Sequence, residues 1–358
     1  MTKKKKNVED YTPAQLQKLI NQKWGEGTAV MGSDPSLAIT RIPSGILSLD
    51  WALGGGFPRG RHSEIFGNWS TGKTYASLRL IASAQKLGMN TCYLDAEGSF
   101  DPDWATSIGI ETNRMTYHRQ VHGNQMVDLA ETLLRSRLYG VIVLDSIAAL
   151  IPKPELDQDM ETVSYGTQQA KMMSAAMRKL TTANDKTALI YINQMRDSIG
   201  SIFRSSGVTP GGRAMSFYAG VRLEMVKMET IKRPGKVIDP KSGEQKKQDV
   251  VRGHRALVKI VKDKTGGSTM GQTTQFVFDY NTGSIDPTED LLYVGRNLGL
   301  VKKKGLKFAV KGFEDEAQTG KERFRKWLKT NKAVAEELQE QIEAIIYDGK
   351  GVVGGTDL

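Results

Sequence analysis

The sequence predicts an α/β protein whose core is a mostly parallel sheet with helices on both faces. Short apolar runs rich in β-branched residues alternate with stretches of helical periodicity from about residue 40 to 280. This alternation is typical of parallel sheets, because each crossover helix covers a face of the sheet. A glycine-rich run at 67–74 stands between an expected strand and an expected helix, as in phosphate-binding folds. The expected strands are 62–66, 90–95, 139–145, 187–193, 220–225 and 256–261.

The composition indicates a folded globular protein with a basic surface. Hydrophobic residues make up 39% of the chain, charged residues 25%, and the formal net charge is +10. An excess of positive charge is typical of nucleic-acid binding, although solubility alone is an alternative reason for it. No apolar run approaches the roughly 20 residues of a membrane helix, and the N-terminal lysines precede no apolar core of a secretory signal. With Cys92 as the one cysteine, we expect a cytoplasmic protein that contacts no membrane.

Composition also suggests the domain boundaries. Residues 1–40 are a basic tail and an arm with one helix at 13–24, for which Thr12 is the expected N-cap. The core spans 41–285 and contains a basic stretch, 227–255, expected to be an exposed hairpin or insertion. Residues 286–348 form a small basic α+β domain, in which 301–332 holds eleven Lys or Arg against four Asp or Glu. Residues 349–358 are expected to be a flexible tail.

The strongest motif is the run GNWSTGKT, which matches G-x-x-x-x-G-K-[ST] in the order strand, loop and helix. Backbone N–H groups of such a loop point at phosphates. In this pattern Lys73 neutralises the β- and γ-phosphates and the Thr74 hydroxyl ligates Mg²⁺. We therefore predict a P-loop NTPase that needs ATP and Mg²⁺; the alternative is a chance glycine-rich turn. The expected nucleotide-binding residues of the loop are Gly67, Asn68, Trp69, Ser70, Thr71, Gly72, Lys73 and Thr74.

Other expected strands end in polar side chains. Asp145 ends an apolar strand, where P-loop folds hold the second carboxylate ligand of Mg²⁺. Asp95 and Glu97 follow another strand; we predict Glu97 as the general base and Asp95 as a helix N-cap or a residue of a solvated loop. Asn193 and Gln194 end a third strand. Gln194 is predicted to sense the γ-phosphate, with a satisfied polar strand end as the alternative.

Directly after Gln194 the chain carries an unusual loop, SIGSIFRSSGVTPGGRA, from Ser198 to Ala214. It is longer than most loops and contains Ile199, Ile202 and Phe203. The composition of the chain does not explain why apolar side chains occur in a long loop.

Together these segments resemble a RecA-type bacterial recombinase. The resemblance runs in order from about residue 13 to 345 and rests on the P-loop and on IPSGILSLDWALGGGFPRGRHSEIFG, LDAEGSFDP, VIVLDSIAALIPKPEL, MMSAAMRKL, INQMRDSIG and GGRAMSFYAGVRLEM. That family hydrolyses ATP, forms a helical filament on single-stranded DNA and pairs it with homologous duplex. The resemblance implies a DNA-dependent ATPase of DNA recombination and repair. Its implied partners are single-stranded DNA, homologous double-stranded DNA, copies of itself, a single-strand DNA-binding protein and loading mediators.

Carried over by position, the resemblance implies roles for individual residues. Glu97 is the catalytic carboxylate, Gln194 couples the γ-phosphate to DNA, and Trp104 stacks on adenine. Lys262 and Lys264 act on the ATP of the neighbouring subunit, and Phe217 contacts the adjacent protomer. The arm, with its helix and 27–32, docks on the next subunit.

The same resemblance implies two DNA-binding loops, at about 155–165 and 195–212. Cations of the second loop would meet phosphates, its apolar side chains would meet bases, and its glycines give backbone freedom. The implied DNA-binding residues are Lys171, Arg178, Arg196, Ile199, Gly200, Ile202, Phe203, Arg204, Gly211, Gly212 and Arg213.

The chain departs from the family pattern in several places. Asn68-Trp69 replaces the usual Pro-Glu of the P-loop, Ser216 stands where a basic residue is frequent, and the acidic tail of many members is missing. Two other functions stay open: a hexameric helicase or translocase on the same core, and an ATP-binding mediator that coats DNA without turnover. About 60 residues precede the P-loop, fewer than such helicases have, and Lys73, Glu97 and Asp145 favour an active ATPase.

Overall fold

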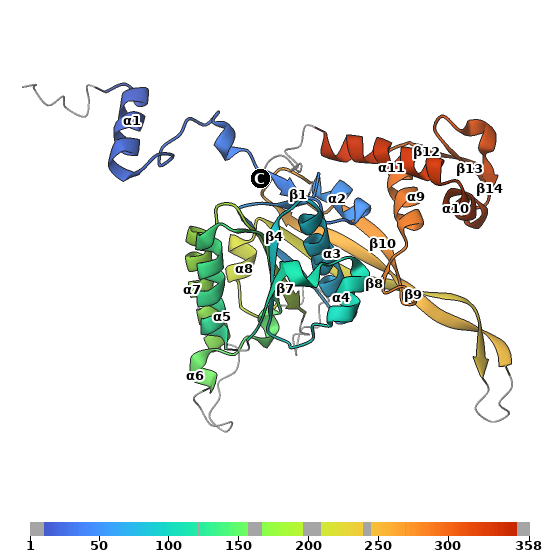
Figure 1. The fold of residues 1–358 in the computed structure, drawn as a ribbon, viewed down its shortest axis with the longest axis horizontal. Coiled ribbons are helices and arrows are strands. Elements are labelled where there is room, and N and C mark those ends of the chain that lie inside the picture. The colour runs from blue at the N-terminus through green and yellow to red at the C-terminus, as the bar shows by residue number, and fades with distance from the viewer. Residues whose placement is uncertain are drawn as a thin grey trace, which may run out of the picture. The chain divides into compact units, whose positions relative to one another are not determined.

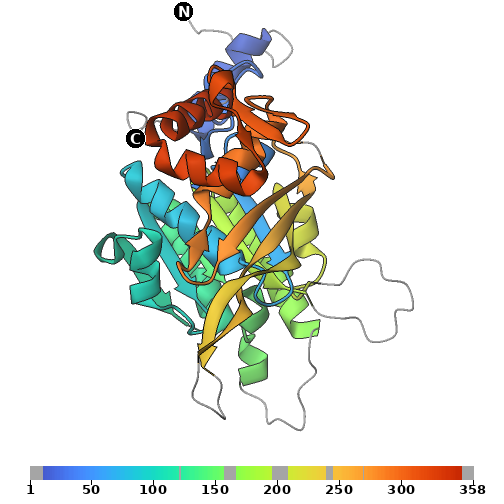
Figure 2. The ribbon, with the colours of Figure 1, turned by 90° about the vertical axis from the view of Figure 1, so that its right-hand side faces the viewer.

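The computed structural model describes residues 11–120, 122–156, 167–195, 209–238, 245–268 and 270–348 (Figures 1 and 2). By its contacts the chain divides into two compact units, Met1–Ile39 and Thr40–Leu358. In the described part of the chain, no helix is both long and apolar enough to cross a membrane.

The first unit contains helix α1 (Pro13–Trp24) and a 3-10 helix (Pro35–Leu37). The expected N-cap is confirmed: the Thr12 hydroxyl accepts from the Gln15 N–H, and the Gln15 side chain accepts from the Thr12 N–H. All residues of α1 are described and none is buried, so its apolar stripe, which includes Leu16 and Trp24, is exposed.

The second unit is built on a large mixed sheet. Among the described residues its strand order is β11-β10-β9-β8-β3-β7-β6-β4-β5. Strands β5, β4, β6, β7, β3 and β8 are joined by parallel pairing, and β9, β10 and β11 continue the sheet antiparallel. The strands are β3 (Arg61–Gly67), β4 (Asn90–Asp95), β5 (Met115–Arg119), β6 (Tyr139–Asp145), β7 (Ala188–Gln194), β8 (Val221–Ile238), β9 (Gln245–Asp263), β10 (Thr273–Asp279) and β11 (Ser284–Ile285); β1 (Arg41–Ile42) pairs with β2 (Phe57–Pro58) outside it.

The predicted α/β fold with a mostly parallel sheet is confirmed, and each expected strand is present. The pattern did not indicate that 256–261, in β9, runs antiparallel, and it missed β5, β10 and β11. Strand β5 buries little of its surface, so it lacks the apolar run that marks a central strand.

Helices cover both faces of the sheet, and a hydrophobic cluster lies under each layer (Figure 1). One cluster joins the sheet to α2, α3 and α4, and the other joins it to α5, α7 and α8. The helices of this region are α2 (Leu47–Leu53), α3 (Lys73–Lys86), α4 (Pro102–Ile108), α5 (Gly123–Ser136), α6 (Lys153–Leu156), α7 (Thr167–Ala183) and α8 (Ala214–Tyr218), with 3-10 helices at Thr112–Arg114 and Ile147–Ala149.

The basic stretch 227–255 belongs to the long antiparallel pair β8–β9. Their register continues from Val221 opposite Asp263 to Ile238 opposite Gln245. Figure 1 shows this hairpin extending well beyond the rest of the sheet. Bulges interrupt the pairing, including one between Lys227 and Thr230.

The C-terminal segment has a hydrophobic cluster of its own, which includes Phe308, Phe324, Leu338 and Ile342. Its elements are α9 (Pro287–Asn297), β12 (Val301–Lys304), β13 (Lys307–Val310), a 3-10 helix (Glu314–Glu316), β14 (Gln318–Thr319), α10 (Lys321–Thr330) and α11 (Lys332–Tyr347).

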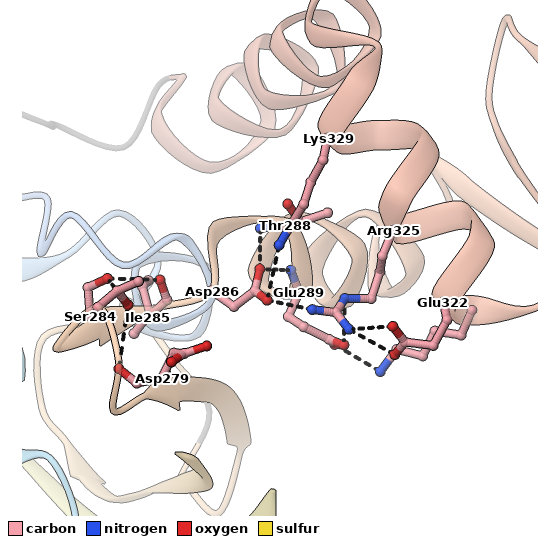
Figure 3. A network of polar contacts seen from close by, with 11 residues as sticks. Asp279, Ser284, Ile285, Asp286, Thr288, Glu289, Glu322, Arg325 and Lys329 are labelled. Atoms are coloured by element: carbon pink, nitrogen blue, oxygen red, sulfur yellow. Dashed lines mark hydrogen bonds and ion pairs between the residues drawn. The ribbon is translucent and has the colours of Figure 1, made fainter. Parts of the chain in front are cut away.

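A buried ion-pair network links α10 to the start of α9 (Figure 3). Arg325 contacts Asp286 at 2.5 Å, Glu289 at 3.0 Å and Glu322 at 2.8 Å. The Asp286 carboxylate also caps α9, because it accepts from the N–H groups of Thr288 and Glu289. Burial raises the pKa of Asp286, but the charges of Arg325 and Lys329 and the hydrogen bonds to its carboxylate together outweigh burial, so the net shift lowers this pKa. The guanidinium therefore orients these two helices.

Candidate nucleotide site

The phosphate loop connects the end of β3 to the start of α3. A Cβ atom on Gly67 would lie 2.1 Å from the Met225 carbonyl oxygen of β8, so the close approach of the two backbones requires glycine. Gly72, at φ 95°, lies in the left-handed region immediately before α3. Together these glycines turn the chain so that the first N–H groups of α3 are free to face an anion.

Lys73 folds back over this loop. Its Nζ donates to the Asn68 carbonyl at 2.7 Å, and the Thr71 hydroxyl donates to the same oxygen at 3.0 Å. Burial lowers the pKa of Lys73, while the negative charges of Asp145 and Glu97 oppose that shift.

Asp145 ends β6 beside the start of α3. Its Oδ2 accepts from the Thr74 hydroxyl at 2.9 Å and from the Tyr93 hydroxyl at 2.7 Å. Burial raises the pKa of Asp145 to about 6, although the Tyr93 hydrogen bond works against the shift. A carboxylate and a hydroxyl side by side are the hard oxygen ligands that Mg²⁺ prefers, so these residues fit the cation. The described residues contain no group of three or more His, Cys, Asp or Glu that could hold a metal ion.

Glu97 lies at the same edge of the sheet, exposed and held by two donors. Its Oε1 accepts from the Gln194 Nε2 at 2.9 Å and from the Ser146 hydroxyl at 2.5 Å. The structure therefore brings together the carboxylate and the amide that the sequence placed at the ends of different strands. The sequence reasoning missed Ser146; its position directly after Asp145 was the available signal.

Asp95 shapes the turn that carries Glu97. Its carboxylate accepts from the N–H groups of Glu97, Gly98 and Phe100 at 3.0, 2.6 and 3.1 Å, and from the Tyr117 hydroxyl at 3.1 Å. The expectation of a helix N-cap or solvated loop residue is therefore wrong for Asp95, because its carboxylate is buried and the N-cap of α4 is Asp101.

Trp104, on α4, lies beside the loop after β10. Its Nε1 donates to the Gly283 carbonyl at 3.3 Å, and its ring packs against the core cluster. Tyr280, which the sequence reasoning did not select, is half exposed in the same loop and bonds to His254 and Lys227.

Lys262, Lys264 and Phe217 are not part of this cluster. Lys262 is opposite Arg222, near the start of β8, whereas the P-loop begins where Gly67 meets Met225 further along that strand. The Lys262 Nζ donates to the carbonyls of Ser216 and Phe217 at 2.6 and 3.0 Å. Burial, with the nearby charges of Lys264 and Arg222, lowers the pKa of Lys262 to about 8.

The predicted DNA-contacting residues are only partly within the structure. Lys171 and Arg178 are exposed on α7, and Gly211 and Gly212 have positive φ just before α8. Arg213 is exposed at the N-terminal end of α8. The described ranges omit Arg196, Ile199, Gly200, Ile202, Phe203 and Arg204, most of the expected first loop and the expected tail.

Comparison with known proteins gives a consistent result. A family model described as the RecA N-terminal domain matches residues 14–283. The protein RecA of Saccharopolyspora erythraea is 37% identical over 341 residues, covering 94% of this chain and 93% of that protein. RecA of Herpetosiphon aurantiacus is 39% identical over 328 residues, covering 91% and 86%. RecA of Bifidobacterium longum is 36% identical over 358 residues, covering 99% and 83%.

Proposed function

The chain belongs to the RecA family, and we propose that its P-loop cluster binds Mg²⁺ and ATP and couples hydrolysis to DNA through Glu97 and Gln194. Like the family, the protein is a DNA-dependent ATPase and a recombinase. It forms filaments on single-stranded DNA and exchanges strands with homologous duplex in recombination and repair.

The observation that carries the proposal is the shared contact on the Glu97 Oε1. One donor to this oxygen is Gln194, which precedes the second expected DNA loop, and the other is Ser146, next to Asp145. Bound Mg·ATP supplies a γ-phosphoryl group whose charge the cation neutralises. Thr74 and Asp145 would hold that cation. Lys73 would exchange the Asn68 carbonyl for phosphate oxygens, and Glu97 would orient a water and accept its proton.

We further propose that Lys262 and Lys264 act on the ATP of the neighbouring subunit. Lys262 lies at the end of β9 and Lys264 directly follows that strand, near the start of β8 and away from the P-loop of the same chain. In a head-to-tail assembly, one end of a subunit meets the opposite end of the next, so these lysines would face the neighbour's phosphates. They would then act as an arginine finger does.

A mixing experiment tests this arrangement. Lys73→Ala removes the lysine of the P-loop, and Lys264→Ala removes a cation offered to the neighbour. Each variant alone should hydrolyse ATP poorly on single-stranded DNA. An equal mixture should regain activity, because about one head-to-tail interface in four joins an intact P-loop to an intact Lys264. A mixture no more active than the two separate variants contradicts action between subunits.

The remaining contacts follow the same proposal. The exposed stripe of α1 would dock on the next subunit, together with the exposed Phe217. The cations of α7 and of the second loop would bind single-stranded DNA, and the basic stretch 301–332 would guide duplex. A single-strand DNA-binding protein and loading mediators are proposed partners, in the cytoplasm of a bacterium or of a phage-infected bacterium.

A further inference from the structure

Glu64 is a buried carboxylate within the apolar strand β3, and none of the roles above uses it. It is 0% exposed. Its Oε1 accepts from the Asn193 Nδ2 at 2.9 Å, and its Oε2 accepts from the Arg222 Nε at 2.5 Å. A buried charge is costly unless it is paired and hydrogen-bonded, so both contacts are needed to hold it there.

Asn193 joins this carboxylate to both ends of the segment that carries the second expected DNA loop. Its Nδ2 also donates to the Pro210 carbonyl at 3.0 Å, and its Oδ1 accepts from the Gln194 N–H at 3.0 Å. Gln194 in turn donates to Glu97. Each polar atom of the Asn193 side chain is therefore bonded, and its position determines where Gln194 and Pro210 lie.

Arg222 extends the network toward the end of the sheet that carries Lys262. Its guanidinium lies 4.7 Å from the centre of the Phe66 ring, and it is opposite Lys262 in the β8–β9 pairing. Lys262 points to the carbonyls that end α8, the helix of the exposed Phe217. A continuous series of bonds thus runs from Glu97 through Gln194, Asn193 and Glu64 to Arg222.

We propose that Glu64 is a positioning residue that links Gln194 and the end of the second DNA loop to the subunit-contacting end of the sheet. A displacement of Pro210 when DNA binds would move Asn193 and, through it, the Gln194 amide against Glu97. Docking of a neighbour on α8 would act on the same network from its Arg222 end. The inference relies on the proposed coupling role of Gln194.

The test compares ATP hydrolysis with and without single-stranded DNA. Glu64→Gln keeps one acceptor oxygen, so it can accept from Asn193 or from Arg222 but not from both, because its amide nitrogen only donates. We expect the ratio of DNA-stimulated to DNA-free hydrolysis to fall about tenfold, a typical size for coupling between sites. The affinity for ATP should change less than about twofold, because no contact of the P-loop is lost.

Tyr191→Phe is the matched control. Tyr191 lies two residues before Asn193 on the same strand, and its buried hydroxyl bonds to His62 at 3.0 Å. This variant loses a buried hydrogen bond on the same face but keeps the Glu64 network. The DNA-stimulation ratio should therefore be unchanged. An equal loss in Tyr191→Phe would overturn the proposal.

Asn193→Ser provides a second route if Glu64→Gln does not fold. It leaves the Glu64–Arg222 pair in place, removes the amide that holds Pro210, and should lose the same stimulation. Gln194→Ala distinguishes the coupling role of Gln194 from the positioning role of Glu64. Full stimulation in Gln194→Ala would refute the coupling role of Gln194. If Gln194→Ala loses the stimulation of ATP hydrolysis by DNA while folded Glu64→Gln and Asn193→Ser both keep it, the Glu64 proposal is refuted and the coupling role of Gln194 stands.

Discussion

Replacing Glu97 with glutamine removes the predicted general base and keeps its shape. The Oε1 of the new amide can still accept from Ser146 and Gln194, so the contacts that position this side chain are retained. The substitution therefore tests the charge of Glu97 and leaves its packing in place.

The size of the effect follows from the chemistry and from neighbouring charges. A positioned general base contributes about 10²- to 10⁴-fold to the rate, or about 2.7 to 5.5 kcal/mol of barrier. The Glu97 charge also raises the pKa values of Lys73 and Asp145. Without it, Asp145 ionises more readily, so the proposed cation ligands are not weakened. We expect hydrolysis to fall by at least about 10²-fold while ATP and DNA remain bound.

Single-turnover hydrolysis on saturating single-stranded DNA measures the rate, and fluorescence anisotropy with a labelled oligonucleotide measures DNA binding. Slow hydrolysis with normal binding supports the assignment. Turnover within about threefold of the wild type, with intact DNA binding, would show that another group takes the proton.

Three other predictions use single positions. Burial raises the pKa of Asp50 to about 7, above its value of 3.8 in an unfolded chain, so its contribution to stability is lost as pH rises from about 4 to 7. The free energy of unfolding, measured in urea at pH 5 and pH 8, should therefore fall less with rising pH in Asp50→Asn than in the wild type, by up to about 1.4 kcal/mol per pH unit. The same fall in both proteins contradicts the burial of this carboxyl as the cause. Trp69 is 83% exposed, so Trp69→Ala should change the free energy of unfolding by less than about 0.5 kcal/mol in thermal melts, whereas a large loss would mean that the ring packs in solution. Tyr93→Phe removes a hydrogen bond that lowers the pKa of Asp145, so the Mg²⁺ requirement of hydrolysis should rise more at pH 6 than at pH 8; equal effects at both pH values speak against that cause.

The sequence predicted best those contacts of the candidate site that follow directly from the order of strands and helices. Neighbouring parallel strands have their carboxyl ends at the same edge of the sheet. The side chains at or just after the ends of four strands, those that end at Gly67, Asp95, Asp145 and Gln194, were therefore expected to lie close together. The contact of Glu97 with Gln194 follows from that rule. To predict this contact, only the positions of the strands had to be known, and the apolar runs in the sequence indicate those positions.

Contacts set by pairing register were not predictable in this way. Glu64 stands in an apolar run, and its partner Arg222 is 158 residues away in sequence. Nothing in either segment indicates that β8 lies next to β3. Similarly, β10 and β11 join an edge of the sheet through the antiparallel β9, and the local pattern does not distinguish that pairing from a parallel one.

The anchors of the second expected DNA loop suggest why DNA should stimulate hydrolysis in this protein. Before the loop, the Met195 N–H donates to the carbonyl of Gly67, the first residue of the P-loop, at 3.2 Å. After it, the Pro210 carbonyl accepts from Asn193, whose neighbour Gln194 holds Glu97. DNA bound to the segment between these anchors would act on both of them, because the backbone on each side of the segment is hydrogen-bonded at its anchor. One anchor is bonded to the proposed phosphate site, and the other is connected through Asn193 and Gln194 to the proposed base, so both parts of the proposed hydrolytic site would respond to one binding event.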